Sequence, residues 1–113
     1  MNIQIWGTRK CQDTRKAERW FKERGIQYQF IDLSQKGLSK GELKSVGAAV
    51  GGLTPLLDTA GKEYEKRNLK YLAHNVEEML LTVPLLFKTP IVRNGSKATV
   101  GYQPETWSLW QKS

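Results

Sequence analysis

The sequence predicts an α/β fold, and two observations lead to this prediction. Within the first 33 residues, a short apolar alternation, an amphipathic segment and a second apolar alternation follow one another. This β-α-β order favours parallel strands joined by a right-handed crossover. Near the other end of the chain, two short apolar segments flank the letters NGS, the strongest hairpin signal in the sequence.

The first three elements are bounded by glycines and by changes of hydrophobic period. Residues 2–6, "NIQIW", alternate and stop at Gly7, which predicts a strand that ends in a loop. The amphipathic segment 12–24 predicts a helix, and Gly25 after it is a typical helix terminator. Residues 26–33, "IQYQFIDL", keep a period of two and predict the second strand.

The middle of the chain predicts three helices. Ser39 and Glu42 form a capping box in "SKGE", and "VGAAVGG" ends the helix that this box opens. A second helix is predicted over residues 62–72, and a third over residues 75–82 with Asn75 as its N-cap.

Three consecutive helices interrupt the β-α-β rhythm, so we interpret residues 39–87 as a helical insertion within one domain of residues 1–113. A chain of 113 residues with 39% hydrophobic residues is large enough to fold around one core. We find no internal repeat and no low-complexity segment.

Proline and tryptophan mark the C-terminal elements. Pro90 cannot donate to a β-ladder, so we expect it at the entrance of the first hairpin strand. Pro104 lies where a last helix begins, and Trp107 and Trp110 share one face of that helix. These two tryptophans are expected in the core.

Cysteine and histidine counts exclude several kinds of site. The one cysteine, Cys11, rules out an intramolecular disulfide, and one histidine cannot complete the usual Cys/His zinc set. Met1 is followed by a strand-like segment, and no apolar run of about 18 residues is present. We therefore expect a soluble cytoplasmic monomer without a membrane anchor and without a bound cofactor.

The position of Cys11 leaves two readings open, a reactive thiol and an inert small residue. It falls between the first predicted strand and the first predicted helix. Unpaired N–H groups and the partial positive charge of a helix N-terminus stabilise a thiolate, and Arg9, Lys10 and Arg15 add positive charge nearby. A structural cysteine would more often lie inside the apolar strand or on the apolar face of the helix.

The net charge of +7 is concentrated around this cysteine, because seven of the eighteen Lys and Arg residues fall between Arg9 and Arg24. Such a cluster attracts anions, which include acidic proteins, oxyanions and glutathione. Arg15, Arg19 and Lys22 follow helical spacing and form either a solvated face or a partner surface. We do not expect direct nucleic-acid binding, since no recognised motif supports it.

Three stretches carry a resemblance to a known family: "WGTRKCQDTRKAERW", "DTAGKEYEKRN" and "KTPIVRNGSKATVGYQPE". Together with the order of elements, they resemble the ArsC-type arsenate reductase family, which includes Spx-type transcription regulators and YffB-type proteins. The chain looks most similar to the YffB-type branch. The resemblance implies a thioredoxin-like fold, with a mixed sheet of about four strands and a helical insertion.

The resemblance also implies a mechanism and a site. The family uses one thiolate that attacks an oxidised substrate and is resolved by glutathione or glutaredoxin, which here makes Cys11 the catalytic residue. Thioredoxin-like folds imply a cis peptide bond between Thr89 and Pro90, with Pro90 near Cys11. The expected substrate-binding residues are Arg9, Lys10, Arg15, Thr89, Pro90 and Arg93.

The chain departs from the family pattern at the residues that hold an oxyanion. Arsenate reductases of this type use arginines there, whereas this chain has Thr59 or Ala60, Thr89 and Tyr102. Bidentate guanidinium contacts are hard to replace. The CxxC switch of the regulators is absent too, because its second position is Thr14.

Two classes of function follow. One is a single-cysteine thiol oxidoreductase that acts through Cys11 with glutathione or glutaredoxin and is not an efficient arsenate reductase. The other is a Spx-like regulator or RNA polymerase-binding module, which uses the helix face of Arg15, Arg19 and Lys22 and lacks the CxxC switch.

Overall fold

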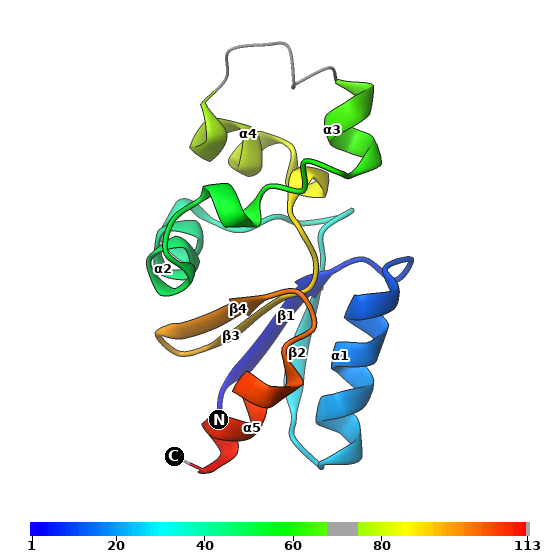
Figure 1. The fold of residues 1–113 in the computed structure, drawn as a ribbon, viewed down its shortest axis with the longest axis vertical. Coiled ribbons are helices and arrows are strands. Elements are labelled where there is room, and N and C mark those ends of the chain that lie inside the picture. The colour runs from blue at the N-terminus through cyan, green and yellow to red at the C-terminus, as the bar shows by residue number, and fades with distance from the viewer. Residues whose placement is uncertain (68–74, 113) are drawn as a thin grey trace.

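The structure, a computed structural model, describes residues 1–67 and 75–112. Figure 1 shows the arrangement of its elements. In chain order they are β1 (Ile3–Gly7), α1 (Gln12–Glu23), β2 (Tyr28–Asp32), α2 (Lys40–Val50), the 3-10 turn η1 (Thr54–Leu56), α3 (Lys62–Lys66), α4 (Val76–Thr82), the 3-10 turn η3 (Pro84–Leu86), β3 (Ile91–Asn94), β4 (Lys97–Val100) and α5 (Pro104–Lys112).

The four strands form one mixed sheet in the order β2-β1-β3-β4. β1 pairs with β2 in parallel and with β3 antiparallel, and β3 and β4 form an antiparallel hairpin. In the register, Trp6 lies opposite Ile91, and Ile3 lies opposite Tyr28. This is the predicted thioredoxin-like architecture, and the predicted β-α-β start and C-terminal hairpin are confirmed.

The strands send alternate side chains to two separate core clusters, as the pleat of a sheet requires. On one face, Ile3 and Ile5 pack against α1 and α5. Trp20, Phe21 and Trp107 form the aromatic centre of this cluster, with the rings of Phe21 and Trp107 at 5.1 Å between centroids. The tryptophans of α5 are therefore core residues, as the sequence predicts.

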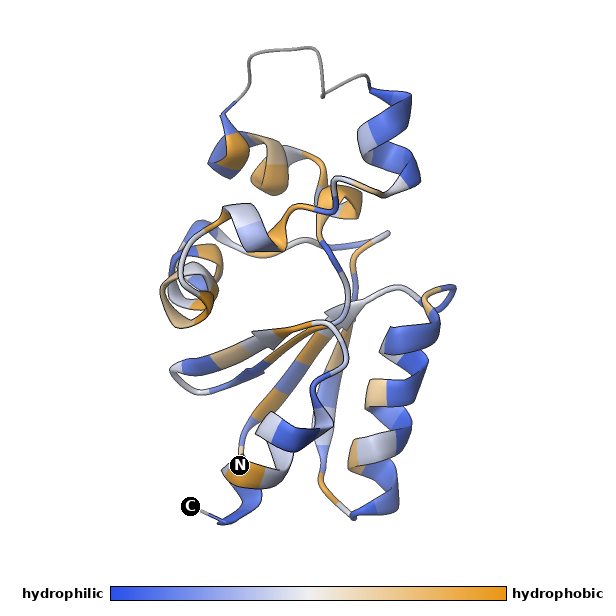
Figure 2. Ribbon diagram, in the orientation of Figure 1, coloured by the Kyte–Doolittle hydropathy of each residue, from blue (hydrophilic) through white to orange (hydrophobic). Residues whose placement is uncertain are grey.

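The other face of the sheet is covered by the insertion. Trp6 and Ile91 pack there with apolar residues that α2, α4 and both 3-10 turns supply. Figure 1 shows α3 and α4 beyond the end of the sheet at which β1 finishes, whereas α2 lies beside β4. Figure 2 shows orange, hydrophobic segments around α2 and α4. An isolated antiparallel bridge joins Leu57, within the insertion, to Phe87 at its C-terminal end.

Local capping signals predicted the helices well. The capping box is present, since Ser39 Oγ accepts from the Glu42 N–H at 3.1 Å and Glu42 Oε1 accepts from the Ser39 N–H at 2.8 Å. Asn75 caps α4 as expected. α3 begins at Lys62 as predicted and ends at Lys66, and the predicted helix from residue 68 onward lies outside the described residues.

The second strand is shorter than its alternation predicts. It begins at Tyr28, because the Ile26 N–H donates to the Phe21 carbonyl at 3.0 Å and so belongs to the turn that ends α1. The hairpin has the expected two-residue loop, in which Gly95 has a φ of 62°. Only glycine adopts this left-handed conformation without a steric penalty.

No helix in residues 1–67 or 75–112 is long and apolar enough to cross a membrane.

We expect Ser39→Ala to lower the free energy of unfolding by about 0.5–2 kcal/mol, because it removes the hydroxyl that accepts from the Glu42 N–H and leaves that N–H without its cap. Chemical denaturation of the two proteins measures this difference. Lys44→Ala, an exposed substitution in the same helix, is the matched control and should change stability by no more than about 0.5 kcal/mol. Equal stabilities for Ser39→Ala and Lys44→Ala would contradict a stabilising role for the box.

Candidate functional site

Cys11 lies in the short loop between β1 and α1, directly before the first residue of α1. The Cys11 N–H donates to the Thr8 carbonyl at 3.1 Å, which closes a tight turn after the strand. Cys11 is the N-cap of α1, with an extended backbone at φ −78° and ψ 119°. Cys11 is half-buried. The position ahead of the first helix is the predicted one.

Thr89 meets the sulfur from a segment 78 residues away in the sequence. Its hydroxyl donates to Cys11 Sγ at 3.1 Å, and the thiol in turn donates to the Thr89 carbonyl at 3.8 Å. The Thr89–Pro90 peptide bond is cis, as the family resemblance implied. This segment is held on both sides, since the Lys88 N–H donates to Leu56 O at 2.7 Å and the Gly101 N–H donates to Pro90 O at 2.8 Å.

Hydrogen bonds at the sulfur lower the pKa of the Cys11 thiol. Burial by itself raises this pKa, but it is outweighed by the side chains of Thr14 and Thr89 and by the N–H groups of Thr14 and Asp13. These groups favour the thiolate because they donate to the charged sulfur. The basic residues around Cys11 are not among these causes, so the first turn of α1 and the Thr89 segment account for the shift.

No contact between the first turn of α1 and the Cys11 sulfur meets hydrogen-bond geometry. The Cys11 side chain makes no capping hydrogen bond, and Thr14 Oγ1 has no partner within hydrogen-bond geometry. Yet both Thr14 and Asp13 lower the pKa of Cys11. We reconcile these observations by protonation state: a neutral thiol is a weak acceptor, whereas a thiolate draws nearby donors.

Arg9 and Lys10 line a cavity of about 480 Å³ that Thr89 also lines. Its floor includes Leu33 and Phe87, and its rim carries both signs of charge. The charged rim residues are Arg9, Lys10, Asp32, Asp58, Lys62 and Glu63. A cavity of similar size along α2, about 500 Å³, is lined by none of the site residues.

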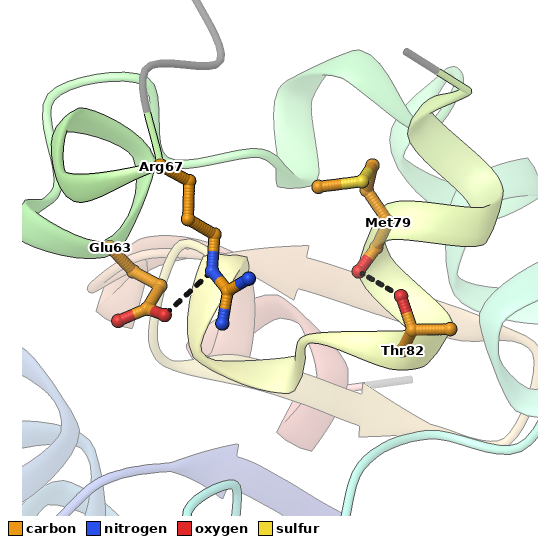
Figure 3. A network of polar contacts seen from close by, with 4 residues as sticks. All are labelled: Glu63, Arg67, Met79 and Thr82. Carbon is orange, nitrogen blue, oxygen red and sulfur yellow. Dashed lines mark hydrogen bonds and ion pairs between the residues drawn. The ribbon is translucent and has the colours of Figure 1, made fainter.

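Three of the charged rim residues have partners of their own. The Arg9 guanidinium lies 4.6 Å from the ring centroid of Phe30. Asp32 accepts hydrogen bonds from the backbone and hydroxyl of Ser34, which lower the pKa of Asp32. Glu63 pairs with Arg67 at 2.8 Å, as Figure 3 shows.

Two predicted site residues lie elsewhere. Arg15 is exposed on α1, and only its N–H contacts Cys11, by donating to the Cys11 carbonyl at 3.1 Å. Arg93 donates to the Gly95 carbonyl at 3.0 Å and to Gln4 Oε1 at 3.3 Å, so the structure does not bring its guanidinium to the sulfur. The reason is the antiparallel register, which carries β3 away from Cys11 after Pro90.

The positions at which the family resemblance implies oxyanion-binding arginines are uncharged here. Thr89 contacts the sulfur directly. The Tyr102 ring packs edge-on against Trp107 at 5.5 Å, and Lys16 Nζ lies 6.0 Å from the Tyr102 centroid. Thr59 is in a turn, where its N–H donates to the Leu57 carbonyl.

Sequence reasoning missed Thr14 as a site residue, although a signal was present. The sequence showed only that Thr14 stands where the regulators have a second cysteine. A residue three positions after an N-cap lies on the same side of the first helical turn, as in a capping box. The charged groups from the insertion, Asp58 and Lys62, were also missed, and only tertiary structure brings them to the rim.

Comparison with known proteins places the whole chain among related sequences. The family model described as the ArsC family matches residues 6–109. YusI of Bacillus subtilis is 30% identical over 93% of this chain and 94% of its own. The global transcriptional regulator Spx 2 of Oceanobacillus iheyensis is 29% identical over 93% of this chain and 80% of its own. The arsenate reductase of Haemophilus influenzae is 29% identical over 94% of this chain and 96% of its own.

Solved structures agree in fold. The structure described as the YFFB (PA3664) protein superposes with a TM-score of 0.82 at 23% identity, and covers 96% of this chain and 97% of that one.

We expect the Cys11 thiol to titrate below the ordinary value of about 8.5, because donors surround the sulfur. The rate of alkylation against pH measures this, and the signal is clean because the chain has one cysteine. A midpoint at or above the ordinary value would contradict an activated thiol.

The same shift should appear in stability. Since the pKa is lower in the folded state, the unfolded state binds more protons between the two pKa values, and folding is favoured as pH rises through that window. Relative to a Cys11→Ser control, the protein should gain stability up to the ordinary thiol pKa and lose this gain as pH falls through the folded one. A pH-independent difference from Cys11→Ser would contradict the shift.

Proposed function

Because this chain belongs to the ArsC family, we propose that it is a single-cysteine thiol oxidoreductase that works through Cys11 with glutathione or glutaredoxin. The Cys11 thiolate attacks one sulfur of a disulfide, for instance oxidised glutathione. A bond forms between Cys11 and that sulfur, the original S–S bond breaks, and the second glutathione leaves as a thiolate that takes up a proton. A thiol of glutathione or glutaredoxin then attacks the mixed disulfide and returns Cys11 to its reduced form.

The polar surroundings of the sulfur of the half-buried Cys11 support this proposal. An inert cysteine packs among apolar groups, which raise its pKa. Here the Thr89 hydroxyl donates to the sulfur at 3.1 Å, and the net effect of the surroundings is a lowered pKa. The thiolate, whose population a lowered pKa increases, is the nucleophile of disulfide exchange.

The charged rim of the adjacent cavity supports glutathione as the cosubstrate. Glutathione carries two carboxylates and one ammonium group, and its own thiol must reach Cys11. Arg9, Lys10 and Lys62 offer positive charge for the carboxylates, and Asp58 offers negative charge for the ammonium. Thr89 lines the cavity and also contacts the sulfur, so a ligand in the cavity would lie beside the reacting atom.

A second candidate function is a regulator that binds RNA polymerase, and the surface of α1 favours it. Arg15, Arg19 and Lys22 are exposed on one helix, which is blue over most of its length in Figure 2. Some relatives, such as Spx 2 of Oceanobacillus iheyensis, are named as transcriptional regulators. Cys11→Ser separates the two functions, because partner binding through α1 survives this change and disulfide exchange does not.

We expect oxidised glutathione to add one glutathione to the protein and none to Cys11→Ser, as intact-protein mass spectrometry would show. Glutaredoxin with reduced glutathione should remove the adduct. Failure of the protein to form this adduct under conditions that label free cysteine would rule out the proposed exchange.

The charged rim should affect this reaction selectively. Lys10→Ala is expected to slow the reaction with oxidised glutathione by about two- to fivefold, and to leave the reaction with neutral hydroxyethyl disulfide unchanged. Lys112→Ala, a charge removed on α5, is the matched control. Equal slowing with both disulfides would mean that Lys10 acts on the thiol and not on the ligand.

We expect negligible arsenate reduction. An oxyanion beside a thiolate needs fixed positive charge, and Thr59, Thr89 and Tyr102 carry none. Each missing charge-assisted contact costs about 1.5–3 kcal/mol, so the loss of several reduces turnover by several orders of magnitude. An assay coupled to glutathione and glutaredoxin measures this, with an arginine-containing family member as the positive control. Comparable turnover by the two proteins would show that other basic residues supply the charge.

A further inference from the structure

Thr14 is a fully buried threonine whose hydroxyl has no partner. Its exposed fraction is 0%, and among the described residues its Oγ1 is the buried side-chain oxygen or nitrogen without a hydrogen bond. Most buried polar groups are paired, because an unpaired one loses its hydration without compensation. An unpaired hydroxyl in this position therefore needs a physical reason.

Gly7 fixes the place of this side chain. A Cβ atom built on Gly7 would lie 2.4 Å from Thr14 Oγ1 and 2.6 Å from Thr14 Cγ2. The first turn of α1 thus packs directly on the last residue of β1, and only a residue without a side chain leaves room for Thr14. The hydroxyl cannot swing out through β1 to find another acceptor.

The sulfur of Cys11 is the acceptor to consider for this hydroxyl, because the Thr14 side chain is among the groups that lower the pKa of Cys11. Cys11 is the N-cap of α1 and Thr14 is the third helical residue, the pair of positions whose side chains and backbones face each other in a capping box. On the opposite side, the Thr89 hydroxyl already donates to the sulfur. Donation from Thr14 would hold the sulfur between α1 and the Thr89 segment.

We propose that Thr14 is a positioning residue whose hydroxyl is held ready for the ionised form of Cys11, and that Gly7 is required to make room for it. The proposal rests on the thiol exchange proposed above and deepens it, by naming the group that engages when the proton leaves. In the protonated protein the hydroxyl stays unpaired, which costs stability. In the ionised protein it donates to the sulfur, which fixes the direction of the nucleophile. The lowered pKa of Cys11, to which the Thr14 side chain contributes, agrees with this role.

The test compares Thr14→Val, which keeps the shape and removes the donor, with Thr14→Ser, which keeps the donor. The pH profile of alkylation gives the ionisation constant of Cys11 for each. We expect Thr14→Val to lower this constant roughly tenfold, as the loss of one charge-assisted bond requires, and Thr14→Ser to stay close to the unmodified protein. At acidic pH, where the sulfur is protonated, Thr14→Val should be at least as resistant to chemical denaturation as the unmodified protein.

Thr99→Val is the matched control for a purely structural effect. Thr99 is also buried, but its hydroxyl accepts from Trp107 Nε1 at 2.8 Å. This variant should lose stability and keep the ionisation constant of Cys11. If Thr14→Val leaves that constant unchanged, or lowers it no more than Thr99→Val does, Thr14 is a packing residue and the proposal is wrong.

Two further variants keep the test decisive if Thr14→Val folds poorly. Thr14→Ala removes the same donor with a smaller side chain and should lower the constant equally. Gly7→Ala should also lower the ionisation constant of Cys11, because the added Cβ displaces the Thr14 side chain. The loss of stability caused by Gly7→Ala should be smaller in a protein that already carries Thr14→Ala than in the unmodified protein, because the smaller side chain leaves room for the Cβ. The outcome is separable from the proposed function: if Cys11 forms no mixed disulfide while these shifts appear, the exchange fails and the role of Thr14 stands.

Discussion

The placement of β1 at the centre of the sheet is the constraint on which the rest of the structure depends. Hydrogen bonds occupy both of its edges, to β2 and to β3, and its side chains enter the core on both faces. A strand so confined cannot shift by one residue without moving Trp6 into the wrong core. Its last residue, Gly7, is therefore fixed in space, and so is the turn that follows. Because this turn is fixed, the position of Cys11 is fixed as well. The start of α1, the insertion and the start of β3 lie near the same end of β1.

Elements that depend on local chemistry could be predicted from the sequence, and contacts that depend on long-range register could not. The capping box and the NGS hairpin depend on a few consecutive residues, and each element of the β-α-β start has its own periodicity and terminating glycine, so these elements appear where expected. The second strand is shorter than predicted because a backbone bond of Ile26 goes to the end of α1, a competition that alternation does not report. Arg93 is close to Pro90 in sequence, yet the pairing with β1 takes it along the sheet, away from Cys11.

The candidate site illustrates why sequence and geometry give different accounts of one thiol. The sequence draws attention to basic residues, since formal charges are easy to recognise. The structure instead attributes the lowered pKa of Cys11 to hydroxyl and N–H donors that outweigh the effect of burial. Arg9 and Lys10 remain at the rim of the cavity, where they favour an anionic ligand. The donors to the sulfur and the charges at the cavity thus come from different residues, and Thr89 is common to both because it donates to the sulfur and lines the cavity.

The contact between Cys11 and Thr89 spans 78 residues, and this separation has a consequence for the growing chain. A protein is synthesised from its N-terminus, so Cys11 leaves the ribosome long before Thr89 exists. Until β3 docks against β1, the sulfur lacks the hydroxyl that stabilises its charge, and it behaves more like the cysteine of a free peptide. At a given pH, nascent, truncated and unfolded copies therefore ionise a smaller fraction of this thiol than the finished protein does. The ionised form of Cys11 thus increases in population as folding is completed.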